Sequence, residues 1–202
     1  MAAAYGAEMP SVLESRGGMV IDIGGGTTGI SVLSLGGLVI SRSIKTAGDS
    51  MNSAIVDYIR NTFNILVGEN MAESVKQKIA DVRETPSESL KMTIRGRSLD
   101  SGLPKSMQLT AVDVKKALDE SIDHIISAVR ETLDETPPEL AGDIIVDGIV
   151  LAGGGALLGG LAERISKATN LKVAVADEPL TCVVRGCGRA LEEINTLRRI
   201  SI

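Results

Sequence analysis

Short apolar runs alternate with glycines in the first quarter of the chain. Three runs rich in β-branched residues, at 19–23, 29–34 and 38–44, are separated by the glycines at 24–26 and 36–37. β-branched side chains favour strands, and glycines favour the tight turns between them. The pattern therefore predicts an antiparallel meander of three strands.

Helical spacing begins after residue 49. Apolar side chains recur there at intervals of three and four, which predicts an amphipathic helix over 50–61. A second helix is predicted over 71–82, with Asn70 as its N-cap. The apolar stripe of the first helix consists of Met51, Ala54, Ile55, Tyr58 and Ile59.

A hairpin and a long helix are predicted for the middle of the chain. The segments 89–99 and 105–109 are typical of two solvated strands around a Ser-Gly-Leu-Pro turn. Thr110 with Asp113 three residues later resembles a capping box and predicts the start of the long helix. The two prolines at 137–138 are expected to end that helix.

The C-terminal part returns to strands and helices in alternation. An apolar strand is predicted from Ile144 through the glycines at 153–155 and into a helix. A strand over 172–176 and a helix from about Thr181 follow. Mixed strand pairing with helical returns makes the predicted fold class α/β.

The composition of the chain argues against nucleic acid as a binding partner. The chain of 202 residues has a net charge of −5 and only three aromatic residues, so it lacks the side chains for phosphate neutralisation and base stacking on nucleic acid. No apolar run approaches the length of a membrane-spanning helix, and the cytosol is the expected compartment. Cys182 and Cys187 have no second Cys/His pair, so we expect two reduced, packed thiols rather than a zinc site.

The first glycine run offers a phosphate site. Its letters match G-x-G-x-x-G at Gly24, Gly26 and Gly29, but a strand follows where the dinucleotide fingerprint needs a helix. Consecutive glycines can bring N–H groups close to an anion, and hydroxyls would add donors. Asp22, at the end of the preceding strand, could hold a hydrated Mg²⁺ ion. The alternative is a tight β-turn with no ligand.

The second glycine run has a different setting. Gly153, Gly154 and Gly155 lie between a predicted buried strand and a helix, where free N–H groups can contact a nucleotide. No Walker lysine follows, so this is not a P-loop. Close packing of a strand–helix turn is the alternative explanation for the glycines.

A charged pair on the second helix completes the candidates. Glu73 and Lys76 lie three residues apart on one helical face, where the carboxylate could accept ribose hydroxyls and the lysine stem could flank a purine. The alternative is that Glu73 serves as the capping-box partner of Asn70, and that Glu73 and Lys76 form an ordinary solvent-exposed pair that binds no ligand.

These segments, in this order, resemble the MreB family of bacterial actins. The similarity rests on "DIGGGTTGISVLSLGGLVISRSIKTAGDSM", "NILVGENMAESVKQKI" and "DEPLTCVVRGCGRAL", and it covers nearly the whole chain. The resemblance implies an actin-like ATPase fold of the ribonuclease H-like type, with a mixed sheet and flanking helices. It also implies a core nucleotide-binding subdomain from residues 1–46 and 140–202, with a smaller α+β subdomain inserted over 47–139.

The resemblance also assigns roles to residues. ATP and Mg²⁺ are the implied cofactors, with Asp22 contacting the metal through water and Thr27 helping to position the attacking water. The residues implied to contact the nucleotide are Gly24, Gly25, Gly26, Thr27, Thr28, Glu73, Ser74, Val75, Lys76, Gly153, Gly154, Gly155 and Ala156.

The function implied by the resemblance is cytoskeletal. Family members assemble with themselves into filaments on the cytoplasmic face of the membrane, with wall-elongation and membrane-anchored shape proteins as partners, and they govern rod shape and wall synthesis. The family pattern places a catalytic glutamate two residues before Met1, and the first phosphate loop and membrane-binding segment earlier still. We therefore expect this chain, as the second lobe, to hydrolyse ATP poorly. The alternative is a nucleotide-independent interaction or filament-capping fragment.

Overall fold

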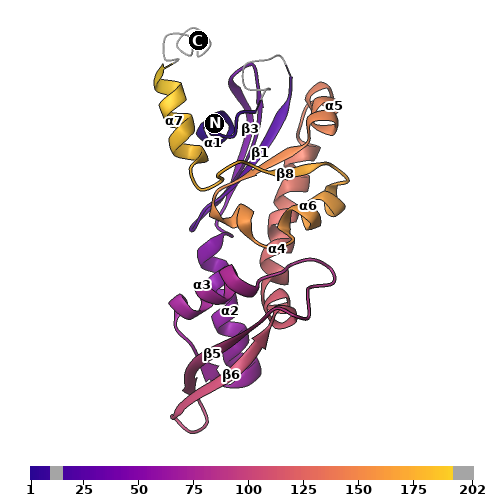
Figure 1. Cartoon of the computed structure of the whole chain (residues 1–202). Helices are drawn as coiled ribbons and strands as arrows, with labels where there is room; N and C mark the ends of the chain where they lie inside the picture. Colours follow the sequence, from indigo (N-terminus) through magenta and orange to yellow (C-terminus); the bar gives the residue numbers. More distant parts are fainter. Residues whose placement is uncertain (10–15, 193–202) are drawn as a thin grey trace.

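The computed structural model describes residues 1–9 and 16–192. A five-stranded sheet with the order β3-β2-β1-β7-β8 forms one part of the molecule (Figure 1). β1, β2 and β3 pair antiparallel, whereas β7 and β8 add in parallel to β1. The predicted three-strand meander is confirmed. The strands are β1 (Gly18–Ile23), β2 (Thr28–Ser34), β3 (Gly37–Ile44), β7 (Ile149–Ala152) and β8 (Val173–Val175).

Helices cover both faces of this sheet. Figure 1 shows α1 (Ala2–Gly6) and α7 (Cys182–Glu192) on one side, with α4 (Ala111–Asp134), α5 (Pro138–Asp147) and α6 (Leu161–Thr169) on the other. Alternate residues of β1 point to opposite faces, so Met19 and Ile21 join the core beneath α4 and α6 while Val20 joins the one beneath α1 and α7. This two-sided burial explains why Met19, Val20 and Ile21 of β1 are all apolar.

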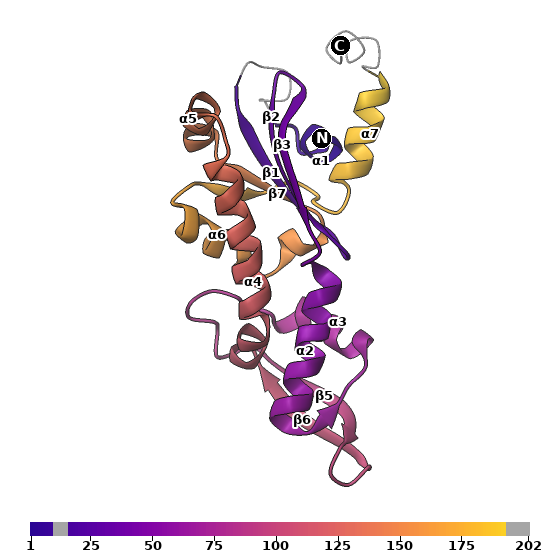
Figure 2. The same cartoon turned by 180° about the vertical axis from the view of Figure 1, so that it is seen from behind.

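A second, three-stranded sheet lies at the far end of the molecule from α5 (Figure 1). Its order is β4-β5-β6, and all its pairs are antiparallel. The long helix α4 runs from α5 down to this end, where α2 lies beside it (Figure 2). The boundaries of the inserted subdomain, residues 47 and 139, stay a prediction. The elements here are α2 (Gly48–Phe63), β4 (Ile65–Leu66), α3 (Glu69–Ile79), β5 (Lys91–Ser98) and β6 (Pro104–Thr110).

The capping box predicted for the long helix is confirmed. The backbone N–H of Asp113 donates to Thr110 Oγ1 at 3.3 Å, and the N–H of Thr110 donates to Asp113 Oδ2 at 3.0 Å. Each side chain thus satisfies an amide that the helix start leaves without a partner. No helix in the described ranges is both long and apolar enough to cross a bilayer.

Three predictions of local structure were wrong. Residues 144–147 belong to α5 rather than to a strand, because Pro138 starts a new helix as well as following the end of the last one. The second helix ends at Ile79, and its N-cap is Gly68, so Asn70 lies inside it. The glycines after β7 lead first into a four-residue 3₁₀ helix, η2 (Gly154–Leu157), before α6 begins.

Candidate functional site

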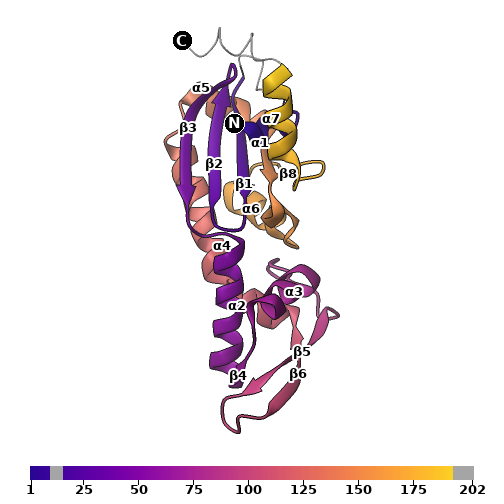
Figure 3. The same ribbon diagram turned by 90° about the vertical axis from the view of Figure 1, so that its left-hand side faces the viewer.

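A cavity of about 620 Å³ lies below the turn between β1 and β2. It is lined by this turn, by α2 and α3, and by the segment that follows β7. All three candidate segments reach it, although they are far apart in the sequence. Figure 3 shows that α2 starts directly beneath the meander of β1, β2 and β3, which places the start of α2 next to the first glycine loop. The lining residues are Gly24, Gly25, Gly48, Asp49, Met51, Glu73, Lys76, Gln77, Gly154, Gly155, Leu157, Leu158 and Leu180.

The first glycine loop is attached to the start of α2. The N–H of Gly24 donates to Thr27 O at 3.0 Å and closes the turn. The N–H groups of Gly48 and Asp49 donate to the carbonyls of Gly24 and Gly25 at 3.0 and 2.8 Å. In the described part of the chain no hydrogen bond is found for the N–H of Gly25, so this exposed amide is free for a ligand.

The two threonines of the loop differ in their surroundings. Thr28 is fully buried, and its hydroxyl donates to Thr46 O at 2.7 Å. Thr27 is exposed, and its hydroxyl makes no hydrogen bond within residues 1–9 and 16–192. The Thr27 hydroxyl is therefore available to a ligand or to water, whereas that of Thr28 is engaged in holding the loop.

Asp22 lies at the end of β1, opposite Ala152 of β7. Burial raises the pKa of its half-buried carboxyl, and the N-terminal amino group lowers it to a smaller extent. Its carboxylate accepts no hydrogen bond from any residue that the structure describes. A desolvated carboxylate without a donor suits a cation or the water shell of one. The described residues contain no cluster of three or more His, Cys, Asp or Glu that could hold a metal by themselves.

Glu73 and Lys76 form a network that joins α3 to α2. Lys76 Nζ donates to Glu73 Oε2 at 2.7 Å and to the carbonyl of Gly48 at 2.9 Å. Glu73 Oε2 also accepts from Asn52 Nδ2 at 2.7 Å, and Oε1 accepts from Gln77 Nε2 at 2.8 Å. The Lys76 ammonium, and then the amides, lower the pKa of Glu73 against the opposing effect of burial. Glu73 is therefore ionised at neutral pH and does not cap the helix.

Ser74 and Val75, which lie between Glu73 and Lys76, do not line the cavity. The side chain of Val75 is fully buried in the core, so any contact from this residue to the cavity would come from its backbone. The hydroxyl of Ser74 donates to Asn70 O at 2.9 Å along the helix. Because successive helix residues are rotated by about 100°, four consecutive side chains cannot all face one cavity.

Close packing accounts for two glycines of the second run. Gly153 has φ +78°, and a Cβ there would lie 2.4 Å from Ile23 O. A Cβ on Gly155 would lie 2.2 Å from the side chain of Ile23. Gly154 and Gly155 both line the cavity, but a Cβ on Gly154 would meet only the end of Leu180, at 3.2 Å. Ala156 is buried and does not line the cavity.

The family model described as MreB/Mbl protein matches residues 1–199. This chain belongs to the MreB/Mbl family. It is 45% identical over 196 residues to the cell shape-determining protein MreB of Escherichia coli strain K12, which covers 96% of this chain and 56% of the relative. It is 42% identical to the cell shape-determining protein Mbl of Bacillus subtilis strain 168, with 96% and 58% covered. The chain thus spans little more than half the length of these relatives.

Solved structures agree with this MreB/Mbl assignment. The chain superposes on MreB 5 of Spiroplasma citri bound to AMPPNP with a TM-score of 0.92 and 36% identity, over 100% of this chain and 60% of that one. A structure of the same protein bound to ADP also gives 0.92, with 37% identity over 99% and 60%. The MamK double helical filament matches with a TM-score of 0.77 and 25% identity over 95% and 57%. The actin-like fold predicted from the resemblance is confirmed.

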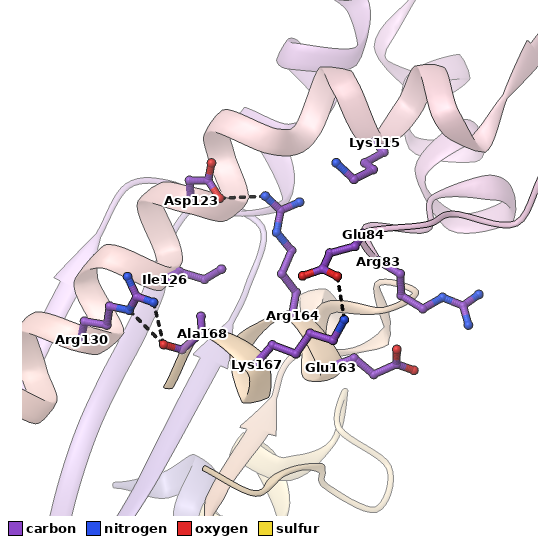
Figure 4. A pocket seen from close by; sticks show the side chains of 10 residues that line it. All are labelled: Arg83, Glu84, Lys115, Asp123, Ile126, Arg130, Glu163, Arg164, Lys167 and Ala168. Atoms are coloured by element: carbon purple, nitrogen blue, oxygen red, sulfur yellow. Dashed lines mark hydrogen bonds and ion pairs between the residues drawn. The ribbon is translucent and has the colours of Figure 1, made fainter. Parts of the chain in front are cut away.

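A second hollow of this MreB/Mbl chain, of about 340 Å³, lies between α4, α6 and the loop after α3. Figure 4 shows Arg164 and Lys167 paired with carboxylates, and Arg130 donating to the carbonyl of Ala168. Arg164 contacts Asp119 at 2.5 Å and Asp123 at 2.8 Å, and Lys167 contacts Glu84 at 2.8 Å. These ion pairs tie α6 to α4 and to the loop, so the hollow belongs to the packing between the two ends of the molecule.

Sequence reasoning missed several cavity residues of this family member. Asp49 and Gln77 line the cavity, and Asn52 contacts Glu73 behind it. Their positions depend on how α2 packs on α3, for which the linear pattern carries no signal apart from Asp49 in the first helical turn. The expectation of two packed thiols was half wrong, because Cys182 is buried but Cys187 is exposed.

Proposed function

We propose that this MreB/Mbl chain binds ATP with Mg²⁺ in the cavity beneath the β1–β2 turn. The observation that carries the proposal is the convergence of Gly24–Gly25, Glu73–Lys76 and Gly154–Gly155 on one cavity. The cavity volume, about 620 Å³, lies within the range of about 300–1,000 Å³ that is usual for such ligands. The Spiroplasma citri structures bound to AMPPNP and ADP support the same assignment.

The phosphates would lie at the first glycine loop. The exposed amide of Gly25 offers an N–H group, and the start of α2 adds the positive end of a helix dipole. Asp22 fits a hydrated Mg²⁺ ion because its carboxylate is partly desolvated and has no protein donor among the described residues. The metal would screen the phosphate charge. Thr27, with its free hydroxyl, would orient water at the terminal phosphate.

The nucleoside would lie at the other end of the cavity. Leu157 and Leu180 are more than half exposed at its rim, and a flat base would cover part of this apolar surface. Gly154 lets the base approach the backbone. The ionised Glu73 would accept hydrogen bonds from the ribose hydroxyls, with Lys76 beside it.

The cellular role proposed here follows from the family. Its curated relatives are named cell shape-determining proteins, and the structural relative MamK forms a double helical filament. We propose that this chain takes part in a self-assembling filament that governs rod shape and wall synthesis at the cytoplasmic face of the membrane. Wall-elongation enzymes and membrane-anchored shape proteins would be the partners of such a filament.

Calorimetric titration with ATP and Mg²⁺ tests nucleotide binding. We expect the chain to bind ATP, and Gly154→Val to weaken binding at least about tenfold because it fills the base end of the cavity. Gly188→Val is the matched control, since a Cβ on Gly188 in α7 meets no atom within 4 Å. Its affinity should equal that of the wild type. No ATP binding by the wild type, or equal binding by Gly154→Val, would contradict the proposal.

A second candidate function is a nucleotide-independent interaction or filament-capping fragment. The observation that favours it is the exposed apolar surface of α7 and of Leu180, two residues before it, where Leu180, Val184 and Leu191 are each about 70% exposed. Apolar patches of this kind commonly mark contacts with another protein. Capping of family filaments by a chain that binds no ATP in the titration would select this function over the first.

A further inference from the structure

Asn52 is a buried polar residue of α2 that directs one end of its amide at Glu73. The residue is only 9% exposed, and its Nδ2 donates to Glu73 Oε2 at 2.7 Å. Its Oδ1 is buried as well and has no hydrogen-bond partner in the described part of the chain. A buried carbonyl oxygen without a donor destabilises the fold. The side chain is therefore not the one that packing alone would favour.

The contact with Glu73 fixes the orientation of this amide. Rotation by 180° about the Cβ–Cγ bond would turn Oδ1 toward the ionised carboxylate and place two acceptors face to face. The unpaired oxygen is thus the consequence of keeping a donor on Glu73. Leucine has the same branched shape as asparagine and would remove the unpaired acceptor, but it could not donate.

Asn52 differs from the other two donors to Glu73. Lys76 and Gln77 belong to α3, the same helix as Glu73, although Lys76 also donates to the Gly48 carbonyl at the start of α2. Asn52 belongs to α2, whose first residues are hydrogen-bonded to Gly24 and Gly25 of the glycine loop. Through Asn52 the Glu73 carboxylate is therefore held at a fixed place relative to the loop that would take the phosphates.

We infer that Asn52 is a positioning residue that holds the Glu73 carboxylate in place for the ribose hydroxyls of the nucleotide. The inference rests on the proposed function, because it needs a nucleotide in the cavity. Asn52 itself does not line the cavity and acts through Glu73. Asparagine at this position leaves one buried acceptor unpaired and so lowers the stability of the fold, but it fixes the carboxylate that would contact the ribose.

The test compares ATP with 2′-deoxy-ATP and 3′-deoxy-ATP in calorimetric titrations of the full chain with Mg²⁺. The wild type should bind ATP about tenfold more tightly than at least one deoxy analogue, since a hydrogen bond to a charged group is lost. In Asn52→Leu this ratio should fall toward one. Its melting temperature should be unchanged or higher by about 2–4 °C, because the unpaired acceptor is gone.

Two further variants separate positioning from packing. Asn52→Ala should also lose discrimination between ATP and the deoxy analogues, and it serves if leucine does not fit the space. Asn61→Leu makes the same replacement at an exposed position of α2 and should keep the wild-type ratio. Lost stability with an unchanged ratio in both Asn52 variants would overturn the inference and leave ATP binding standing. A wild type that binds no ATP would overturn the proposed function and the inference with it.

Discussion

The ammonium of Lys76 donates a hydrogen bond of 2.9 Å to the carbonyl oxygen of Gly48. The N–H of Gly48 in turn donates to the carbonyl of Gly24, so α3 is connected through one residue of α2 to the glycine loop. The two ends of the proposed nucleotide site, 52 residues apart between Gly24 and Lys76, thereby share a hydrogen-bonded path. Changes at Lys76 should affect the ligand more than the fold.

Replacement of Lys76 by methionine tests this path. The methionine keeps the apolar stem but removes the ammonium, so ATP should bind about tenfold more weakly. The free energy of unfolding should fall by less than about 1 kcal/mol, because Glu73 is 41% exposed and its ion pair is screened by water. Lys78→Met, at an exposed position of α3, is the control. Equal ATP affinities of the two variants in a titration would refute the role of Lys76.

Gly153→Ala should destabilise the fold by roughly 2–4 kcal/mol. The residue has φ +78°, and the new Cβ would lie 2.4 Å from Ile23 O and 2.6 Å from Asp22 Oδ1. Gly142→Ala in α5 is the matched control, since its Cβ meets no atom within 4 Å. That change should stabilise the protein by about 0.5–1 kcal/mol, because alanine favours a helix over glycine. Urea denaturation measures both, and equal effects would contradict the packing described.

Acid should remove a contribution from Asp81. The hydrogen bonds from Arg83 and the Ser87 N–H hold its pKa at about 2 in the folded protein, against the opposing effect of burial and a usual value of 3.8. Because the folded pKa is the lower one, the contribution is full above pH 3.8 and is lost as the pH falls toward 2. Asp81→Asn should therefore cost about 1–2 kcal/mol at pH 7 and almost nothing near pH 2.

Denaturation of both proteins across this pH range measures the Asp81 effect. Asp57→Asn is the control, because Asp57 is 55% exposed in its pair with Arg60 and its replacement should change little at any pH. A stability difference between wild type and Asp81→Asn that stays constant from pH 7 to pH 2 would show that the carboxylate does not stabilise the fold as described.

The two cysteines should differ in reactivity. Cys187 is exposed, whereas Cys182 is buried and burial raises the pKa of its thiol. A thiol reagent such as Ellman's should therefore modify one thiol rapidly in the folded protein and two in denaturant. Cys187→Ser should abolish the rapid phase, and Cys182→Ser should leave it intact. A rapid phase that survives Cys187→Ser would mean that Cys182 is accessible.

The meander and the long helix could be predicted because their signals are local. Glycines separate the strands of the meander, and Thr110 with Asp113 marks the helix start within four residues. Helix α5 was missed because Ile144 and Val146 favour a strand locally, while the Pro138 that begins the helix could equally mark the end of the previous one.

The candidate site was predictable only in outline. Glu73 and Lys76 could be paired from their helical spacing, and the resemblance placed them with the glycines. That Asn52 would contact Glu73 depends on the packing of α2 against α3, which no local pattern encodes. The glycine pattern also could not show that a Cβ on Gly153 or Gly155 would clash with Ile23, whereas one on Gly154 would meet only the end of Leu180.

Photolabelling with 8-azido-ATP tests the central claim most directly, because it reports where the base lies. The account predicts labelling that excess ATP suppresses and that maps to Glu69–Ile79, to Gly154–Leu158 or to Leu180. Labelling of the β5–β6 hairpin, or labelling that ATP does not suppress, would contradict the account that these segments form one nucleotide site.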